Sequence, residues 1–256
     1  MRTLVIGMGE VGTALRMVLQ GRYEVDSFDV GGAYQANYAK YDVLHVCFPY
    51  RKCCSDYGTQ HAGRDFESDV RIYQAIWAPK LVVIHSTVPV GTTRRLGPRT
   101  VHSPVQGVHP HLVDGLRTFR KYVGGVDPAV VEFAVDHLQA SGIPAYRVSS
   151  PEFAEAIKLW LTTGYAWNIL LCKEIKRYCD ANGLPFEEVY GTVRDYNEGY
   201  AKLGRPEVAW PILTPTPGPL GGHCLRPNSA LLDARVAQIV RDWSDGYADE
   251  LPAGGE

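Results

Sequence analysis

Short apolar runs alternate with amphipathic stretches along the first 150 residues of the chain. The apolar runs are rich in β-branched residues and have the length of strands buried inside a parallel sheet. We expect strands at residues 3–6, 23–29, 42–47, 81–84, 100–102, 122–124 and 145–148. Helices are expected between them at residues 13–19, 67–78 and 130–140. Strands that alternate with helices predict an α/β domain over residues 1–149, with a doubly wound parallel sheet covered on both faces.

After residue 149 the pattern becomes helical. The longest periodic stretch, residues 152–182, predicts one helix well above the average length, with Ser150 as its N-cap and Gly183 as its stop. A helix of this length usually packs against a partner, so we expect a homodimer that forms through residues 152–182.

The remaining segments are shorter. Helices are expected at residues 185–196 and 229–245, and residues 206–228 form a loop that is rich in proline and glycine. Residues 150–256 are therefore expected to form a smaller all-helical domain.

Residues 7–12 connect the first strand to the first helix and read Gly-Met-Gly-Glu-Val-Gly. In this position the pattern G-x-G-x-x-G is typical of a turn that binds a dinucleotide. Gly7 permits the tight turn, Gly9 lets the backbone approach a pyrophosphate, and Gly12 lets the helix pack on the strand. The N–H groups at the start of the helix would face the phosphates. The pattern predicts a Rossmann-type sheet whose cofactor contacts are Gly7, Gly9, Glu10, Val11 and Gly12.

The second strand ends in an acidic residue, Asp29. A carboxylate at this place can accept hydrogen bonds from both hydroxyls of an adenosine ribose and would repel a 2′-phosphate, so the sequence favours NAD over NADP. The alternative is that Asp29 only begins the turn before Gly31 and Gly32, in a Rossmann-like fold without a nucleotide.

Composition and charge exclude several other classes of protein. The 26 Lys and Arg residues nearly balance the 28 Asp and Glu residues, which argues against general binding to nucleic acid. No apolar run approaches the roughly 20 residues that span a bilayer, and the N-terminus enters a strand at once, which leaves no room for a secretion signal. The six cysteines form no C-x-x-C pair and are expected to be reduced thiols. We therefore expect a cytoplasmic protein without a membrane or nucleic-acid partner.

Three later segments point to a family. They read S-T-V-P-V-G-T-T at residues 86–93, A-E-A-I-K at residues 154–158 and G-P-L-G-G-H-C at residues 218–224. Together with V-C-F-P at residues 46–49 and the glycine pattern, they resemble the nucleotide-sugar dehydrogenases, the family of the UDP-glucose, UDP-N-acetylmannosamine and GDP-mannose dehydrogenases. The resemblance runs from the start of the chain to about residue 228.

The resemblance implies an N-terminal NAD domain, a central helical dimerisation domain and a C-terminal nucleotide-binding domain. The last of these is missing from the 256 residues, so the chain resembles a compact form of the family. Its small-molecule substrate then need not carry a nucleotide, or a partner protein supplies the missing surface. The resemblance also places Phe48, Pro49, Ser86 and Thr87 at the cofactor.

The chemistry that the resemblance implies is the oxidation of a primary alcohol to a carboxylate in two hydride transfers, with a thioester before the last step. Cys224 matches the family's thiolate nucleophile, Lys158 the lysine that stabilises oxyanions, and Thr87 the threonine that holds a catalytic water. Glu155 lies on the same helix face as Lys158 and is expected to orient it. The structural alternatives are a buried Cys224, a solvated surface pair of Glu155 and Lys158, and a Thr87 that only caps a turn.

Several positions depart from the family pattern. Val105 stands in place of the acid/base glutamate, Thr162 in place of an asparagine, and Asn228 in place of an aspartate. His109 stands where a second glutamate often lies. Valine cannot hold a proton and an amide cannot act as a base, so the step that hydrolyses the thioester is the one most affected.

Histidines are the available substitutes for the missing carboxylates. His109 or His102 could act as the general base, because histidine titrates near neutral pH. With His111 they make three histidines in one short segment, but no acidic or thiol partner lies at ligand spacing, so no metal site is predicted.

Three functions remain open from the sequence. The first is an NAD-dependent dehydrogenase of the nucleotide-sugar type that uses Lys158 and Cys224. The second is a single-step dehydrogenase like the β-hydroxyacid dehydrogenases, which share the Rossmann-plus-helical plan and have no need of Cys224. The third is a non-catalytic NAD-binding subunit, in which Val105 and Asn228 mark chemistry that has been lost.

Overall fold

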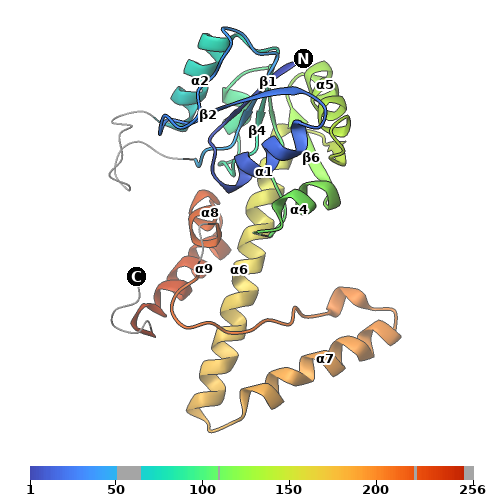
Figure 1. Cartoon of the computed structure of the whole chain (residues 1–256). Helices are drawn as coiled ribbons and strands as arrows, with labels where there is room; N and C mark the ends of the chain where they lie inside the picture. Colours follow the sequence, from blue (N-terminus) through green and yellow to red (C-terminus); the bar gives the residue numbers. More distant parts are fainter. Residues whose placement is uncertain (51–64, 109, 222–223, 251–256) are drawn as a thin grey trace. The chain divides into compact units, whose positions relative to one another are not determined.

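The computed structural model describes residues 1–50, 65–108, 110–221 and 224–250 (Figure 1). The chain divides into two units, Met1–Lys158 and Leu159–Glu256, and each is described by itself. We call them unit 1 and unit 2. Helix α6 begins in unit 1 and ends in unit 2.

Unit 1 contains one seven-stranded sheet with the order β2-β1-β3-β4-β5-β6-β7. Its strands are β1 (Arg2–Ile6), β2 (Glu24–Phe28), β3 (Val43–Val46), β4 (Leu81–Ile84), β5 (Thr100–His102), β6 (Lys121–Gly125) and β7 (Ala145–Arg147). Each lies where the sequence predicts a strand. The first five are parallel to one another, which confirms the α/β class and the Rossmann-type arrangement.

The expectation of a wholly parallel sheet is wrong at β6. This strand pairs antiparallel with β5, so that His102 faces Gly124, and β7 then pairs parallel with β6. The connection from β5 to β6 contains a short helix that packs beside α1, and it does not cross back to the other end of the sheet. The chain therefore enters β6 at the edge where β5 ends, and the two strands run in opposite directions.

Five helices belong to unit 1 and precede α6 within the described residues. They are α1 (Glu10–Leu19), α2 (Phe66–Trp77), α3 (Thr92–Arg95), α4 (Leu112–Thr118) and α5 (Pro128–Gln139). Asp65 caps α2 by accepting a hydrogen bond from Ser68 N at 2.7 Å, and Asp127 caps α5 by accepting one from Ala129 N at 2.9 Å. The sequence does not predict α3 and α4, because helices of four and seven residues are too short to show a helical period.

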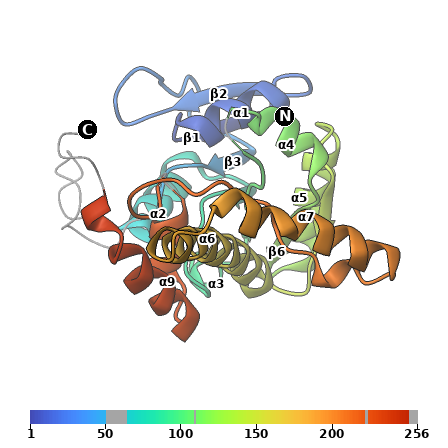
Figure 2. The same ribbon diagram turned by 90° about the horizontal axis from the view of Figure 1, so that it is seen from below.

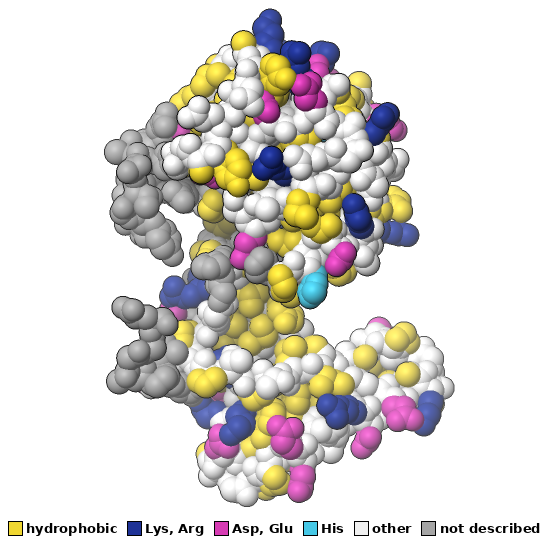
Figure 3. Space-filling model, viewed as in Figure 1, with side chains coloured by type: hydrophobic (Ala, Val, Ile, Leu, Met, Phe, Trp, Pro, Cys, Tyr) yellow, Lys and Arg dark blue, Asp and Glu magenta, His cyan; other side chains and the backbone are white. Residues whose placement is uncertain are grey.

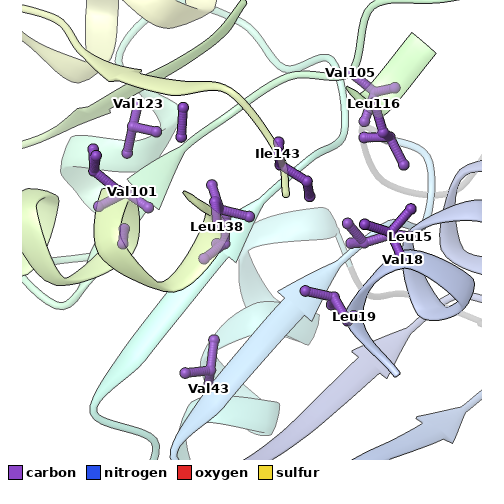
Figure 4. Packing of buried hydrophobic residues seen from close by; sticks show 14 of the residues in the cluster. Leu15, Val18, Leu19, Val43, Val101, Val105, Leu116, Val123, Leu138 and Ile143 are labelled. Carbon is purple, nitrogen blue, oxygen red and sulfur yellow. The ribbon is translucent and has the colours of Figure 1, made fainter. Parts of the chain in front are cut away.

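Helices cover both faces of the sheet because successive strand residues point to opposite sides. Val5 and Val43 face a cluster of apolar residues from α1, α4 and α5 (Figure 4). Leu4, Ile6 and Leu44 face a second cluster, to which α2 contributes four buried side chains. These two clusters fix the carboxyl edge of the sheet, where the glycine turn lies.

Unit 2 is helical. It contains α6 (Pro151–Ala181) from Leu159 onward, α7 (Phe186–Lys202), α8 (Leu225–Leu231), α9 (Arg235–Asp245) and the short 3-10 helices η1 (Pro206–Val208) and η2 (Ala248–Glu250). Both views show α7 on one side of α6 and α9 on the other, and residues 209–221 cross α6 between them (Figures 1 and 2). None of the helices in the described ranges is long and apolar enough to cross a membrane.

The ends of α6 follow the sequence prediction. Ser150 Oγ accepts a hydrogen bond from Phe153 N at 3.2 Å, as expected of an N-cap. Gly183 has a φ of +66°, the left-handed conformation in which a helix commonly stops.

Two expectations for the later helices are wrong. Helix α7 continues to Lys202, six residues beyond its expected end at 196. The single helix expected at residues 229–245 is broken into α8 and α9, because Leu232 and Ala234 are extended. The break lets Leu232 pack with Leu159 and Ala237 in a small apolar cluster, which a continuous helix would not allow.

Candidate functional site

The glycine turn lies at the carboxyl edge of β1, where the order of the sheet reverses. From β1 the chain passes first to β2 on one side and then to β3 on the other. In open α/β sheets the crevice at such a switch point is the usual place for a bound ligand.

Two glycines of the turn are required by close contacts. Gly7 has a φ of +90°, and a Cβ atom added to it would lie 2.6 Å from Phe48 N. A Cβ atom on Gly12 would lie 1.9 Å from Gly7 O. Gly7 therefore lets the chain turn against the end of β3, and Gly12 lets α1 pack against the turn, as the sequence predicts.

Gly9 is different, because the space in front of it is open. It precedes α1 as the N-cap residue without a side-chain cap, and among the residues that the structure describes no atom beyond its chain neighbours lies within 4 Å of an added Cβ atom. Next to it, Glu10 is exposed and Val11 is half-buried. The backbone N–H groups that begin this ten-residue helix are the kind of group that binds a diphosphate, because they end the helix dipole without intrahelical partners.

Asp29 follows β2 and lies beside the same turn. Its Oδ2 accepts a hydrogen bond from Met8 N at 2.6 Å, and its Oδ1 accepts one from Gly31 N at 3.2 Å. The bond to Gly31 is the one expected if Asp29 begins a turn. The bond to Met8 places the carboxylate at the glycine turn itself, which is the position that ribose recognition requires.

The ends of β3 and β4 are joined beside this turn. Ser86 Oγ donates a hydrogen bond to Phe48 O at 2.5 Å, and the ring of Phe48 packs against Phe66 with their centroids 5.0 Å apart. Pro49 is exposed and Thr87 is half-buried. The predicted residues Phe48, Pro49, Ser86 and Thr87 thus lie at the carboxyl edge that also holds the glycine turn.

Two lysines bind three successive carbonyl groups after β5. Lys158 Nζ donates to Val105 O at 2.8 Å, while Lys121 Nζ donates to Ser103 O at 2.7 Å and to Pro104 O at 3.0 Å. Val105 is itself part of the apolar core, where the resembled family has a glutamate. Burial lowers the pKa of Lys121 to about 7, and the charge of Lys158 acts in the same direction.

A chain of buried histidines ends on the same segment. His85 Nδ1 lies 2.9 Å from Ser103 O, His45 Nδ1 lies 2.8 Å from His85 Nε2, and His137 Nε2 lies 3.0 Å from His45 Nε2. A carbonyl oxygen can only accept, so Nδ1 of His85 holds a proton. Burial keeps His85 and His45 neutral, so each accepts at one ring nitrogen while it donates from the other, and the hydrogen bonds run toward Ser103.

Burial lowers the pKa of each histidine in this part of unit 1. The pKa values of His45 and His85 are well below the usual range, and that of His137 falls to about 4. His102, one of the two candidate general bases, is also buried, with a pKa of about 4, and its Nε2 donates to Ser86 O at 3.0 Å. The other candidate base, His109, lies outside the described residues.

Glu155 does not orient Lys158 as expected. It is fully buried, and its two carboxylate oxygens accept hydrogen bonds from Gly91 N at 2.6 Å and Thr93 N at 2.8 Å. Glu155 therefore fixes the start of α3 to α6. Burial raises its pKa.

Cys224 lies in unit 2 and is described with that unit alone. It is exposed as a free thiol and directly precedes α8. Asn228 is buried one turn later, and its backbone N–H donates to Cys224 O at 3.0 Å. Thr162 Oγ1 donates to Leu159 O at 3.1 Å within α6. Over the residues that the structure describes, no three His, Cys, Asp or Glu side chains converge to hold a metal ion.

Lys121 and the histidine chain are absent from the sequence-based site. A weak signal existed: His45 interrupts an otherwise apolar strand, and Lys121 opens another strand. The sequence does not reveal which residues these side chains contact. His45, for example, is bonded to histidines that lie 40 and 92 residues away along the chain.

Several solved structures that share this fold are dehydrogenases. The UDP-D-ManNAc dehydrogenase of Pyrococcus horikoshii superposes with a TM-score of 0.73 at 19% identity, over 96% of this chain and 68% of that chain. A UDP-glucose dehydrogenase of Pyrobaculum islandicum gives a TM-score of 0.67 at 16% identity, over 96% and 68% of the two chains. The 3-hydroxyisobutyrate dehydrogenase of Mycobacterium tuberculosis gives 0.65 at 17% identity, over 97% and 94%.

These likenesses show a shared fold. No family model matches the sequence, and no curated protein sequence matches it significantly.

Proposed function

We propose that this protein is an NAD-dependent oxidoreductase that acts on CH–OH groups and resembles the nucleotide-sugar dehydrogenases. The observation that carries the proposal is the glycine turn at the switch point of the sheet, with Asp29 bonded to Met8 inside that turn. The shared fold with solved dehydrogenases supports it.

The cofactor would be held by backbone groups and one carboxylate. Gly9, Glu10 and Val11 would offer their N–H groups to the diphosphate, and Asp29 would accept from the adenosine ribose. The negative charge of Asp29 opposes a 2′-phosphate, which favours NAD over NADP. Ser86, whose hydroxyl ties the end of β4 to Phe48, would keep the cofactor edge of the sheet in shape.

The substrate end would use the residues beyond the turn. When bound, NAD supplies the acceptor for a hydride that leaves the alcohol carbon. The ammonium group of Lys158 would stabilise the oxyanion that develops on the substrate oxygen, and Thr87 would hold a water molecule. His109 stays a candidate for the general base.

Cys224 is the proposed nucleophile of the second oxidation. Its thiolate would add to the aldehyde carbon, so that an S–C bond forms and the carbonyl π electrons move onto oxygen. The carbon of this thiohemiacetal would lose a hydride to a second NAD as its oxyanion re-forms the carbonyl group. Water would then attack the resulting thioester and release the thiol and a carboxylate. The exposed thiol of Cys224 is accessible for such a role.

A single-step dehydrogenase of the β-hydroxyacid type is the second candidate. It is supported by the fold that this chain shares with the M. tuberculosis 3-hydroxyisobutyrate dehydrogenase, at a TM-score of 0.65. In this case Cys224 has no covalent role, and Lys158 alone polarises the substrate oxygen.

The proposed partners are a small-molecule substrate and a second copy of the chain, in the cytoplasm. Exposed apolar side chains support a homodimer through α6: Trp160, Leu161 and Tyr165 are each about half exposed. Figure 3 shows hydrophobic side chains gathered along the middle of this helix. Aromatic residues exposed on one helix are typical of an interface.

The direct test is a screen for NADH formation with sugar nucleotides, simple primary alcohols and small hydroxy acids. The first candidate predicts that Cys224→Ser still forms aldehyde but no acid. The second predicts that Cys224→Ser behaves like the wild type. Binding of NAD without turnover of any substrate, and without an effect of Lys158→Ala, would contradict both and indicate a non-catalytic subunit.

A further inference from the structure

The segment that leads to Cys224 has no regular structure and depends on side chains from neighbouring helices. Residues 209–221 contain neither helix nor strand and cross α6 (Figure 1). Earlier in the segment, Asn197 of α7 makes two hydrogen bonds of 2.8 Å to the backbone of Trp210, and Tyr190 donates to Pro211 O at 2.9 Å. The part closest to Cys224 is held by a different group.

That group is the ammonium of Lys173, in the middle of α6. Its Nζ donates to Gly218 O at 2.6 Å and also to Thr216 O. The side chain is 3% exposed, and its Nζ lies 5.2 Å from the centroid of the Tyr247 ring. Burial of an ammonium group costs free energy unless hydrogen-bond acceptors or an aromatic face surround it. The hydrogen bonds of Lys173 to the loop therefore stabilise both the buried charge and the loop.

The carbonyl groups that Lys173 binds belong to a turn that contains a left-handed glycine. Gly218 stands between Pro217 and Pro219 with a φ of +76°, a conformation that glycine adopts readily. Two residues later, Leu220 is buried and its N–H donates to Ser244 Oγ of α9 at 2.9 Å. Lys173 on one side and Ser244 on the other thus fix the chain just before the segment that ends in Cys224.

We propose that Lys173 is a positioning residue for the Cys224 thiol, acting through the turn at residues 216–220. This inference rests on the proposed role of Cys224 as a nucleophile. An attacking sulfur must be held within a few tenths of an ångström of its reaction geometry, and an irregular loop does not provide this by itself. The buried ammonium supplies the missing constraint from the longest helix of the fold.

The test uses a nitroxide spin label on Cys224, in a background in which Cys53 and Cys54 are changed to serine. We expect Lys173→Met to sharpen the electron paramagnetic resonance spectrum, because the released turn lets the label move faster. Lys173→Arg should keep the wild-type spectrum, since a guanidinium can still donate to both carbonyl groups. Lys176→Met is the matched control, because the side chain of Lys176, one turn away on α6, is 42% exposed and pairs with Asp180 at 2.5 Å.

Activity gives the second readout, measured with the unlabelled proteins. We expect Lys173→Met to lower kcat by roughly tenfold or more with little change in the Kd for NAD, because misplacing a reacting group slows the chemical step. If Lys173→Met does not fold, Lys173→Gln keeps one donor and should give an intermediate spectrum and kcat.

Two outcomes would overturn the inference. One is a spectrum of Lys173→Met that is the same as that of the wild type. The other is a mobile label with an unchanged kcat in a protein whose acid formation depends on Cys224. If the wild type forms no NADH with any substrate, the proposed function fails, while the spin-label spectra still decide whether Lys173 holds the turn.

Discussion

The buried histidines of unit 1 make its stability depend on pH. His102 and His137 both have a pKa of about 4 in the folded chain, against an ordinary value of 6.5. Below pH 6.5 the unfolded chain takes up protons that the folded chain does not. The stabilisation is therefore complete above pH 6.5 and is lost progressively as the pH falls toward 4.

The size of the effect follows from these shifts. Between pH 7.5 and pH 5, each of the two histidines should reduce the free energy of unfolding by about 2 kcal/mol, or about 4 kcal/mol together. His45 and His85 act in the same direction, because their pKa values are also lowered by burial. A loss of this size is a large part of the total stability of a typical domain, which is about 5–15 kcal/mol.

Urea unfolding at pH 7.5 and pH 5 measures this difference. His137→Phe keeps an aromatic ring against Tyr23, whose ring is stacked on His137 at 4.4 Å, and removes one titrating group. We expect its loss of stability between the two pH values to be about 2 kcal/mol smaller than that of the wild type. His111→Gln is the control, because the side chain of His111 is 71% exposed. Equal pH dependence in the wild type and His137→Phe, or a wild type equally stable at both pH values, would refute the reasoning.

Three further predictions concern single residues. Gly12→Ala places a Cβ atom 1.9 Å from Gly7 O, so we expect thermal unfolding to show a loss of about 2 kcal/mol or more, and an unchanged stability would contradict the packing described for α1. Gly183→Ala forces a φ of +66° on alanine, which should cost about 1 kcal/mol in urea unfolding; no cost would mean that α6 ends differently. Lys158→Met should lower kcat for NADH formation by about 100-fold while the Kd for NAD stays constant. A change in the Kd alone would contradict a role of Lys158 in the chemical step.

The α/β fold was predictable because its signals are local. Each strand of unit 1 is a short apolar run, and the turn at Gly7, Gly9 and Gly12 is recognisable from spacing alone. The antiparallel direction of β6 was not predictable, because it depends on where the preceding connection places the chain. The break between α8 and α9 was missed for a similar reason, since a buried contact of Leu232 decides it.

The site was predictable only in part. Asp29 and Ser86 could be placed at the cofactor edge because they directly follow strands. The role of Glu155 was misjudged, because helical spacing suggested Lys158 as its partner, whereas its actual partners are backbone N–H groups 62 and 64 residues away. The buried Lys121 was missed because its acceptors are backbone carbonyl groups. Every residue has such a group, so the sequence cannot indicate which ones a lysine binds.

The central claim is that the glycine turn of unit 1 binds NAD, and calorimetric titration of NAD into the wild type and Gly9→Ala tests it most directly. Within the described part of the chain, an added Cβ atom at Gly9 meets no atom beyond its chain neighbours within 4 Å, so the variant should unfold at the wild-type temperature. The account predicts that the wild type binds NAD more tightly than NADP and that Gly9→Ala binds NAD roughly tenfold or more weakly, because its methyl group occupies the place of the diphosphate. Equal affinity of both proteins for NAD, or no binding to the wild type, would contradict it.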